Sequence, residues 1–308
     1  MELSTETARG LALPPDVKTA DVAGARLAYL ERGSGQPVVF VHGSISDLTI
    51  WEPQLGPIGE SYRAIAYSRR YAWPNQDLPW GEKDTMQPHV DDVLAFLRAV
   101  DAYPAHLVGN SWGAFICLRA AIQEPAAVRS LVLEEPPLVP LITGAPPAPA
   151  QILKSLLRHP RVTVTTLRFA AGTVAPVTKL IKAGDVDASI SRFAQGVLGR
   201  QAVDQLPEEV RAHMRANAST HVGQALADGG FEPITESDIA SVGTPALVIT
   251  GANSPAMFRR LAELLASLLP NSRTVEVPAA SHAMHVENPT VVNDALLRFL
   301  ASVTDQHR

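Results

Sequence analysis

Apolar and polar positions follow two distinct patterns along the chain. Short apolar runs bounded by turn residues predict buried strands of a mostly parallel sheet. Longer stretches with apolar residues three and four positions apart predict helices that cover this sheet on both faces. The predicted strands span residues 25–32, 37–41, 62–67, 105–108, 128–133, 245–250 and 273–277. The predicted helices span residues 89–100, 114–121, 255–269 and 289–303. This alternation predicts an α/β fold with a doubly covered sheet.

The pattern changes between residues 137 and 233. Strand signals fade in this part of the chain, and helical spacing dominates. A proline-rich connector at residues 144–149, Gly-Ala-Pro-Pro-Ala-Pro, is predicted to be extended, because a residue before proline avoids the helical region. We therefore interpret residues 137–233 as a helical cap, inserted into an α/β core made of residues 1–136 and 234–308.

Composition narrows the class of protein. The chain has 308 residues, of which 46% are hydrophobic and 19% charged, enough for one large α/β domain with an insertion. The net charge of -5 and the lack of a Lys/Arg run argue against a nucleic-acid partner. The single cysteine, Cys117, excludes a disulfide framework and a thiolate metal cluster. We expect Cys117 to be a small buried residue.

The length of the apolar runs bears on localisation. No run approaches the ~18 residues needed to cross a bilayer. The acidic and polar residues 1–7 do not resemble the basic and then apolar start of a secretory signal. We expect a cytoplasmic protein with a small-molecule substrate and no membrane partner, and its oligomeric state stays open.

The main chemical motif is Gly-Asn-Ser-Trp-Gly at residues 109–113. It lies between the predicted strand 105–108 and the predicted helix 114–121. Gly-x-Ser-x-Gly between a strand and a helix is the nucleophile elbow, a sharp turn that exposes the serine oxygen at the end of the sheet. Its glycines let the strand and the helix approach closely. The motif predicts that Ser111 is a nucleophile.

Two further motifs accompany the elbow in family-like order. Residues 39–44 read Val-Phe-Val-His-Gly-Ser, and residues 280–289 read Ala-Ser-His-Ala-Met-His-Val-Glu-Asn-Pro. Together the three motifs resemble the α/β-hydrolase fold over about residues 25–303. The resemblance implies a serine nucleophile, a histidine base, a carboxylate and an oxyanion hole, with no cofactor and no metal.

A serine hydroxyl needs a base within hydrogen-bond reach, and the base needs an orienting carboxylate. The resemblance places the base at His282, just past the last predicted strand. His285, three residues further on, is interpreted as a packing residue. Most relatives carry the acid after the strand read here as 245–250, where this chain has Ser254, which cannot ionise. Ser254 before Pro255 fits the N-cap of the next helix.

A second location for the acid is known in this fold, after the strand that follows the elbow helix. Some haloalkane dehalogenases and zearalenone-type lactone hydrolases use it. Here Glu134 and Glu135 stand at the end of the predicted strand 128–133. Because successive residues of an extended segment face opposite sides, only one of them can reach His282. Alignment on the strand end predicts Glu135 as the acid and directs Glu134 to the other side.

The remaining candidates line the expected site. The backbone N–H groups of Ser44 and Trp112 are predicted to form the oxyanion hole. The Ser44 hydroxyl either adds a donor to this hole or bonds to its own loop. Trp51, Arg69 and Tyr71 are candidate substrate-binding residues, since an arginine among aromatic rings suits an anionic or aromatic group. The alternatives are core packing for Trp51 and structural ion pairs for the arginines at positions 69 and 70.

These residues predict a cofactor-free serine hydrolase that cleaves an ester or lactone of an apolar or aromatic small molecule through an acyl-enzyme. A haloperoxidase that forms peracids, or a C–C bond hydrolase, is an alternative on the same fold. A non-catalytic, receptor-like binding protein is the alternative of another class. Halide or epoxide displacement is disfavoured, because those relatives carry an aspartate where Ser111 stands.

Overall fold

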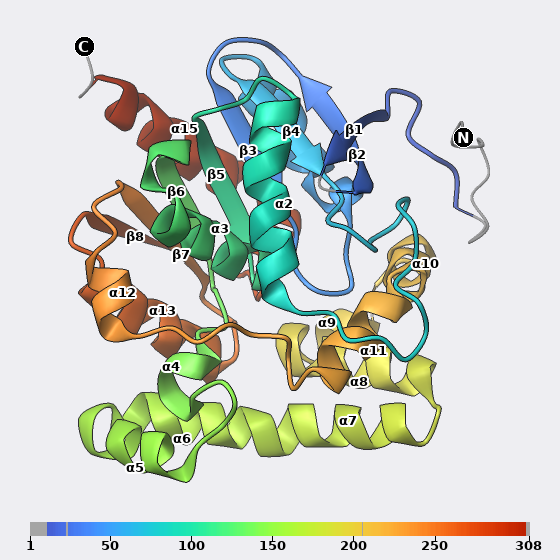
Figure 1. Ribbon diagram of the computed structural model, residues 1–308, viewed down its shortest axis with the longest axis vertical. Coiled ribbons are helices and arrows are strands. Elements are labelled where there is room, and N and C mark those ends of the chain that lie inside the picture. Colours follow the sequence, from blue (N-terminus) through green and yellow to red (C-terminus); the bar gives the residue numbers. More distant parts are fainter. Residues whose placement is uncertain (1–10, 23, 205, 306–308) are drawn as a thin grey trace.

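An eight-stranded sheet forms the centre of the molecule in the computed structural model, which describes residues 11–22, 24–204 and 206–305 (Figure 1). Its order is β1-β2-β4-β3-β5-β6-β7-β8. β1 and β4 pair antiparallel with β2, and the other neighbours are parallel, so the predicted α/β fold class is confirmed. The strands are β1 Lys18–Val22, β2 Ala25–Arg32, β3 Pro37–Val41, β4 Arg63–Tyr67, β5 Ala105–Asn110, β6 Val128–Glu134, β7 Ala246–Gly251 and β8 Ser272–Val277.

Both faces of the sheet are buried, because side chains alternate between them. In β3, Val39 and Val41 join one core with helices α2, α3 and α13, whereas Val38 and Phe40 join a second core with helices α1 and α15. The bounds of these helices are α1 Glu52–Gly59, α2 Met86–Ala99, α3 Trp112–Gln123, α13 Ala256–Leu268 and α15 Pro289–Asp305. Cys117 in α3 is buried, as expected, and burial raises the pKa of its thiol.

Most predicted elements coincide with the observed ones, and the elements that escaped prediction include β1 and α1 as well as several short helices. β1 is an edge strand in which only Val22 is buried, so it lacks an apolar run. Helix α1 contains Pro53, Gly56 and Pro57, residues that normally indicate a turn. Burial of Leu55 and Ile58 against the sheet stabilises α1 despite these residues.

The segment 137–233 contains helices throughout its described part. Helices α6 and α7 are continuous through the short π-helical segment η3 and form the long rod along the bottom of Figure 1. The connector 144–149 turns rather than extends: Gly144 has a φ of 83°, and the Ala148 N–H donates to the Thr143 carbonyl at 2.7 Å. The helices are α4 Val139–Thr143, α5 Pro149–Arg158, α6 Pro160–Phe169, η3 Ala170–Val174, α7 Ala175–Lys182, α8 Val186–Leu198, α9 Arg200–Asp204, α10 Glu208–Ala216 and α11 Ala218–Leu226.

We call residues 137–233 the cap segment, and its status as a separate domain stays a prediction. Four short helices complete the described chain: η1 Leu48–Trp51, η2 Pro125–Ala127, α12 Glu236–Ala240 and α14 Met284–Glu287. Among the residues that the structure describes, no helix combines the length and apolar content needed to cross a bilayer.

Two buried histidines affect how stability depends on pH. Burial, helped by the positive charge of Arg129, lowers the pKa of His106 in β5 to about 4. Burial alone lowers the pKa of His221 in α11 to about 4. In an unfolded chain each imidazole has a pKa of about 6.5, so between about pH 6.5 and pH 4 the unfolded state binds more protons than the folded state. The free energy of unfolding should therefore fall as the pH falls through this window.

The substitution His106→Gln, which keeps a hydrogen-bonding side chain, tests this linkage. It should reduce the slope of unfolding free energy against pH by about 1 kcal/mol per unit within the window. Urea titrations at several pH values measure the slope. Equal slopes for the wild type and the variant would contradict the assignment.

Candidate active site

Ser111 lies at the sharp turn between β5 and α3. Its φ of 53° and ψ of -122° are strained for a residue with a side chain. The flanking glycines make the turn possible: a Cβ at Gly113 would lie 2.2 Å from the Val41 carbonyl oxygen, and one at Gly109 would lie 2.6 Å from the Ala114 backbone nitrogen. The turn therefore holds the start of α3 directly against the end of β3.

The contact expected between Glu135 and His282 is present. Glu135 Oε2 lies 2.6 Å from His282 Nδ1, and both side chains are buried. Because a carboxylate only accepts, the Nδ1–H of His282 donates to it and Nε2 is left as the acceptor. Within the described residues, Nε2 has no hydrogen-bond partner. The Gly251 N–H donates to the other Glu135 oxygen at 3.0 Å, and Phe258 stacks on the imidazole at 3.9 Å.

Glu134 makes a parallel pair with His285. Its Oε2 lies 2.7 Å from His285 Nδ1, and both groups are fully buried. Trp51 stacks on His285 at 4.3 Å between ring centres, which agrees with the packing interpretation of this histidine. Asn110 bridges the two pairs, because its Nδ2 donates to Glu134 at 3.2 Å and to the His282 carbonyl at 3.0 Å. The adjacent glutamates thus pair with two different histidines.

Two expectations near His282 were wrong. Helix α13 begins at Ala256 with Pro255 as its N-cap, and the buried Ser254 hydroxyl caps no helix. Pro255, with a φ of -52° and ψ of 141°, sits outside the helix rather than in its first turn. Nearby, Glu287 accepts hydrogen bonds from the backbone N–H and hydroxyl of Ser281. It therefore braces the turn before His282.

The loop after β3 is held by a neutral histidine and an arginine. His42 Nδ1 donates to the Gly43 carbonyl at 2.9 Å, and Nε2 accepts the Arg69 N–H at 2.9 Å. Burial and the charge of Arg69 lower the pKa of His42 well below its usual value, so this tautomer is kept. The Arg69 guanidinium donates to the carbonyls of His42 and Gly43 at 3.2 and 2.9 Å. Together these contacts fix the backbone that leads into Ser44.

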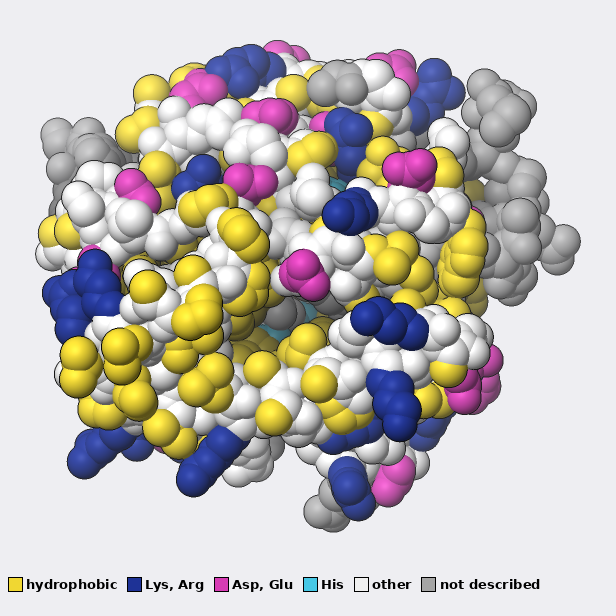
Figure 2. Space-filling model, turned by 60° about the horizontal axis from the view of Figure 1, so that its bottom comes forward, with side chains coloured by type: hydrophobic (Ala, Val, Ile, Leu, Met, Phe, Trp, Pro, Cys, Tyr) yellow, Lys and Arg dark blue, Asp and Glu magenta, His cyan; other side chains and the backbone are white. Residues whose placement is uncertain are grey.

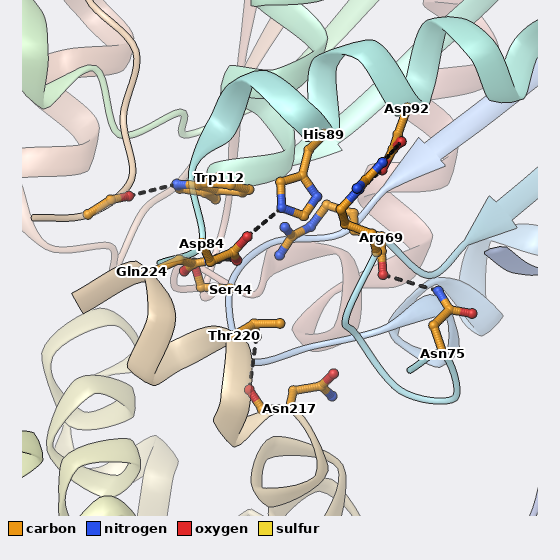
Figure 3. A network of polar contacts seen from close by, with 12 residues as sticks. Ser44, Arg69, Asn75, Asp84, His89, Asp92, Trp112, Asn217, Thr220 and Gln224 are labelled. Atoms are coloured by element: carbon orange, nitrogen blue, oxygen red, sulfur yellow. Dashed lines mark hydrogen bonds and ion pairs between the residues drawn. The ribbon is translucent and has the colours of Figure 1, made fainter. Parts of the chain in front are cut away.

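The Ser44 hydroxyl bonds to the cap segment, and the alternative bond to its own loop is not found among the described residues. Its Oγ donates to Gln224 Oε1 in α11 at 2.7 Å. Gln224 Nε2 donates to Asp84 at 3.0 Å, and the other Asp84 oxygen accepts from His89 Nε2 at 2.7 Å (Figure 3). Sequence reasoning missed Gln224 and Asp84, because a single amide or carboxylate in a polar stretch carries no signal of a partner far along the chain.

The three substrate-binding candidates do not line the cavity at this site. Trp51 is fully buried and packs against Phe40 and His285. Arg69 is also buried, and its guanidinium is used by the loop carbonyls and by the Trp112 ring, 4.6 Å away. Tyr71 lies beneath the Arg70 guanidinium, which pairs with Asp92. Core packing therefore describes Trp51 better than substrate binding does. Arg70 forms a structural ion pair, and Arg69 binds the carbonyls of the loop.

A cavity of about 1210 Å³ opens onto Ser111 and His282. Its cap side is largely apolar, and its polar wall includes Asp47, Glu52, Glu209 and His213. The apolar lining comprises Ile45, Ile50, Phe193, Ala194, Val197, Leu198, Val210 and Met214, among others.

His213 is a basic side chain that lines the cavity, and the exposed Arg200 is another. Burial acts to lower the pKa of His213, but the hydrogen bond to Asp47 at 2.9 Å and the charges of Glu209 and Glu52 outweigh it and raise the pKa. The carboxylates of the wall thus favour the charged imidazole. Among the described residues, no cluster of three or more His, Cys, Asp or Glu side chains is arranged to hold a metal ion.

Comparison with known proteins identifies the family and the fold. The model of the alpha/beta hydrolase family matches residues 38–295. "Putative non-heme bromoperoxidase BpoC" of Mycobacterium tuberculosis is 28% identical over 284 residues, which cover 90% of this chain and 98% of that protein. A thermophilic esterase from Thermogutta terrifontis has a TM-score of 0.73 at 18% identity, covering 93% of this chain and 98% of its own.

The enol-lactonase from Burkholderia xenovorans LB400 has a TM-score of 0.70 at 18% identity, and the match covers 92% of this chain and all of that one. At these identities the two structures establish the fold alone. Since the family model spans most of the sequence, the protein belongs to the alpha/beta hydrolase family.

Proposed function

We propose that the protein is a cofactor-free serine hydrolase that cleaves an ester or lactone through an acyl-enzyme. The observation that carries the proposal is the buried Glu135–His282 pair, whose Nε2 has no partner within the described residues and which shares a cavity with Ser111. A neutral imidazole with a free Nε2 is the form that accepts a proton from serine.

In the proposed reaction, Ser111 Oγ attacks the substrate carbonyl as His282 Nε2 takes its proton. Glu135 holds the tautomer and stabilises the imidazolium by charge. The backbone N–H groups of Trp112 and Ser44 donate to the oxyanion, and α3 supports this assignment because the first N–H groups of a helix have no intrahelical partner. His282 then returns the proton to the leaving alcohol, and water releases the acyl group by the same steps in reverse.

The cavity narrows the substrate class. Its apolar cap side suits an apolar or aromatic group, whereas its polar wall carries both carboxylates, such as Glu52 and Glu209, and the basic side chains of Arg200 and His213. Because the Arg69 guanidinium is buried in the loop, it is not available to neutralise a substrate carboxylate. We therefore propose an ester or lactone of an apolar or aromatic small molecule as the substrate.

A second candidate is perhydrolysis, in which hydrogen peroxide replaces water and the acyl-enzyme yields a peracid. The similarity to the BpoC protein favours it. It needs the same three residues, so product analysis with and without peroxide separates it from simple hydrolysis.

A fluorophosphonate probe tests the proposed nucleophile directly. The wild type should gain one adduct mass, located by peptide mapping on Ser111, and Ser111→Ala should gain none. A wild type that takes no label while correctly folded would contradict the proposal and favour a receptor-like binding protein.

Gln224 provides a test of whether the cap segment positions the loop after β3 that carries Ser44. The nearly isosteric Gln224→Leu removes the anchor of Ser44, and a displaced oxyanion donor should lower kcat for a p-nitrophenyl ester about tenfold or more, with a smaller change in KM. The exposed Gln123, which bonds outside the site, supplies a control as Gln123→Leu. Equal kcat values for the two variants would show that the cap anchor does not position the loop.

A further inference from the structure

The outer side of the cap segment exposes a concentration of aliphatic side chains. Six of the eleven large hydrophobic residues exposed in the described chain fall between residues 153 and 174, and Leu157 is 79% exposed. Figure 2 shows apolar side chains gathered at the lower left of that face, with Lys and Arg side chains at the edge. We call this the α5–α6 surface, with apolar members Leu153, Leu156, Leu157, Val164, Leu167 and Val174. A gathered patch of this kind usually marks an interaction site.

The charge of this segment is opposite to that of the whole chain. Residues 136–184 contain no Asp or Glu, although the chain has a net charge of -5. Their six cationic side chains are all exposed, and only Arg158 forms an ion pair within the described residues, with Glu236. The six are Lys154, Arg158, Arg161, Arg168, Lys179 and Lys182.

Helical spacing combines the two kinds of side chain on one surface. Leu153, Leu156 and Leu157 lie three and four positions apart in α5, so they share a face. In the continuous helix of α6, η3 and α7, Arg161, Val164 and Arg168 follow the same spacing. Helices α5 and α6 pack against each other, which makes the surface continuous.

We propose that the α5–α6 surface docks onto the headgroup region of an anionic lipid bilayer. Aliphatic side chains on an amphipathic helix enter the boundary between headgroups and acyl chains, and Lys and Arg are attracted to anionic lipids. The expectation of no membrane partner depended on the length of apolar runs. That criterion concerns spanning and says nothing of surface docking.

Other occupants fit the surface less well. A second copy docked by a two-fold axis would bring two cationic faces together. Single-stranded nucleic acid is bound through aromatic stacking platforms, and the exposed large hydrophobics of this surface are all Leu or Val. An anionic bilayer offers both negative charge and an apolar layer. The proposal does not depend on the chemistry of Ser111.

Sedimentation with phosphatidylcholine vesicles, prepared with and without phosphatidylglycerol, tests the proposal. The wild type should pellet with the anionic vesicles at low ionic strength, bind neutral vesicles at least tenfold more weakly, and dissociate as salt is added. The double variants Leu153→Ser/Leu157→Ser and Arg161→Glu/Arg168→Glu should each lower the partition coefficient at least tenfold, because each removes one of the two contributions.

The matched control is Lys83→Glu/Leu226→Ser, which changes one exposed cation and one exposed aliphatic residue outside this surface. It should bind like the wild type, and circular dichroism verifies the fold of each variant. Equal binding to neutral and anionic vesicles, or no binding by the wild type, would overturn the proposal. A dimer that dissociates in Leu153→Ser/Leu157→Ser would overturn it in favour of a second copy.

Discussion

The hydrogen bond between Glu135 and His282 is the interaction on which the candidate site depends. A fully buried carboxylate is costly unless it is paired and its remaining lone pairs are satisfied. His282 Nδ1 takes one Glu135 oxygen, and the Gly251 N–H takes the other. The pair therefore joins the end of β6 to the end of β7 and to the loop after β8. This arrangement leaves the second nitrogen of His282 without a partner within the described residues, in a side chain that lines the same cavity as Ser111.

The neighbouring pair shows why adjacent glutamates are not redundant. Glu134 ends β6 in register with Asn110 of β5, so its side chain lies beneath the elbow and meets His285 and Asn110. Glu135 follows with a φ of 47°, which turns the chain out of the strand. Because Glu135 is not extended, this turn, rather than the alternation of a strand, directs its carboxylate to His282. Glu134 pairs with His285, which is packed beneath the site, and Glu135 pairs with His282, which lines the cavity.

The sequence predicted the parts of the molecule that periodicity and motif determine. Central strands are mostly apolar, and the elbow motif between a strand and a helix pointed to Ser111, whereas the resemblance to the α/β-hydrolase fold pointed to His282 and Glu135 at strand ends. Contacts between side chains far apart in the chain left no such pattern. The bond from Ser44 to Gln224 crosses 180 positions, and Arg69 looked like a substrate ligand because its carbonyl partners were invisible in the sequence. Edge strand β1 was missed because it pairs with β2 while only Val22 is buried. The proline-containing α1 was missed because burial against the sheet, rather than local preference, stabilises it.

The cap segment contributes to the candidate site and to the outer surface of the molecule. Gln224 of the cap segment bonds to Ser44 in the loop after β3, and helices α8 and α10 line the cavity. The outer side of the cap segment carries a basic and apolar surface. The central claim nevertheless concerns the acid, and the comparison of Glu135→Gln with Glu134→Gln tests it most directly. With both variants shown to be folded, the account predicts that Glu135→Gln lowers kcat for a p-nitrophenyl ester roughly 10³-fold or more, as loss of the triad carboxylate does elsewhere. It predicts that Glu134→Gln stays within about tenfold of the wild type, because that carboxylate acts only on packing. A larger loss in Glu134→Gln than in Glu135→Gln would contradict the account.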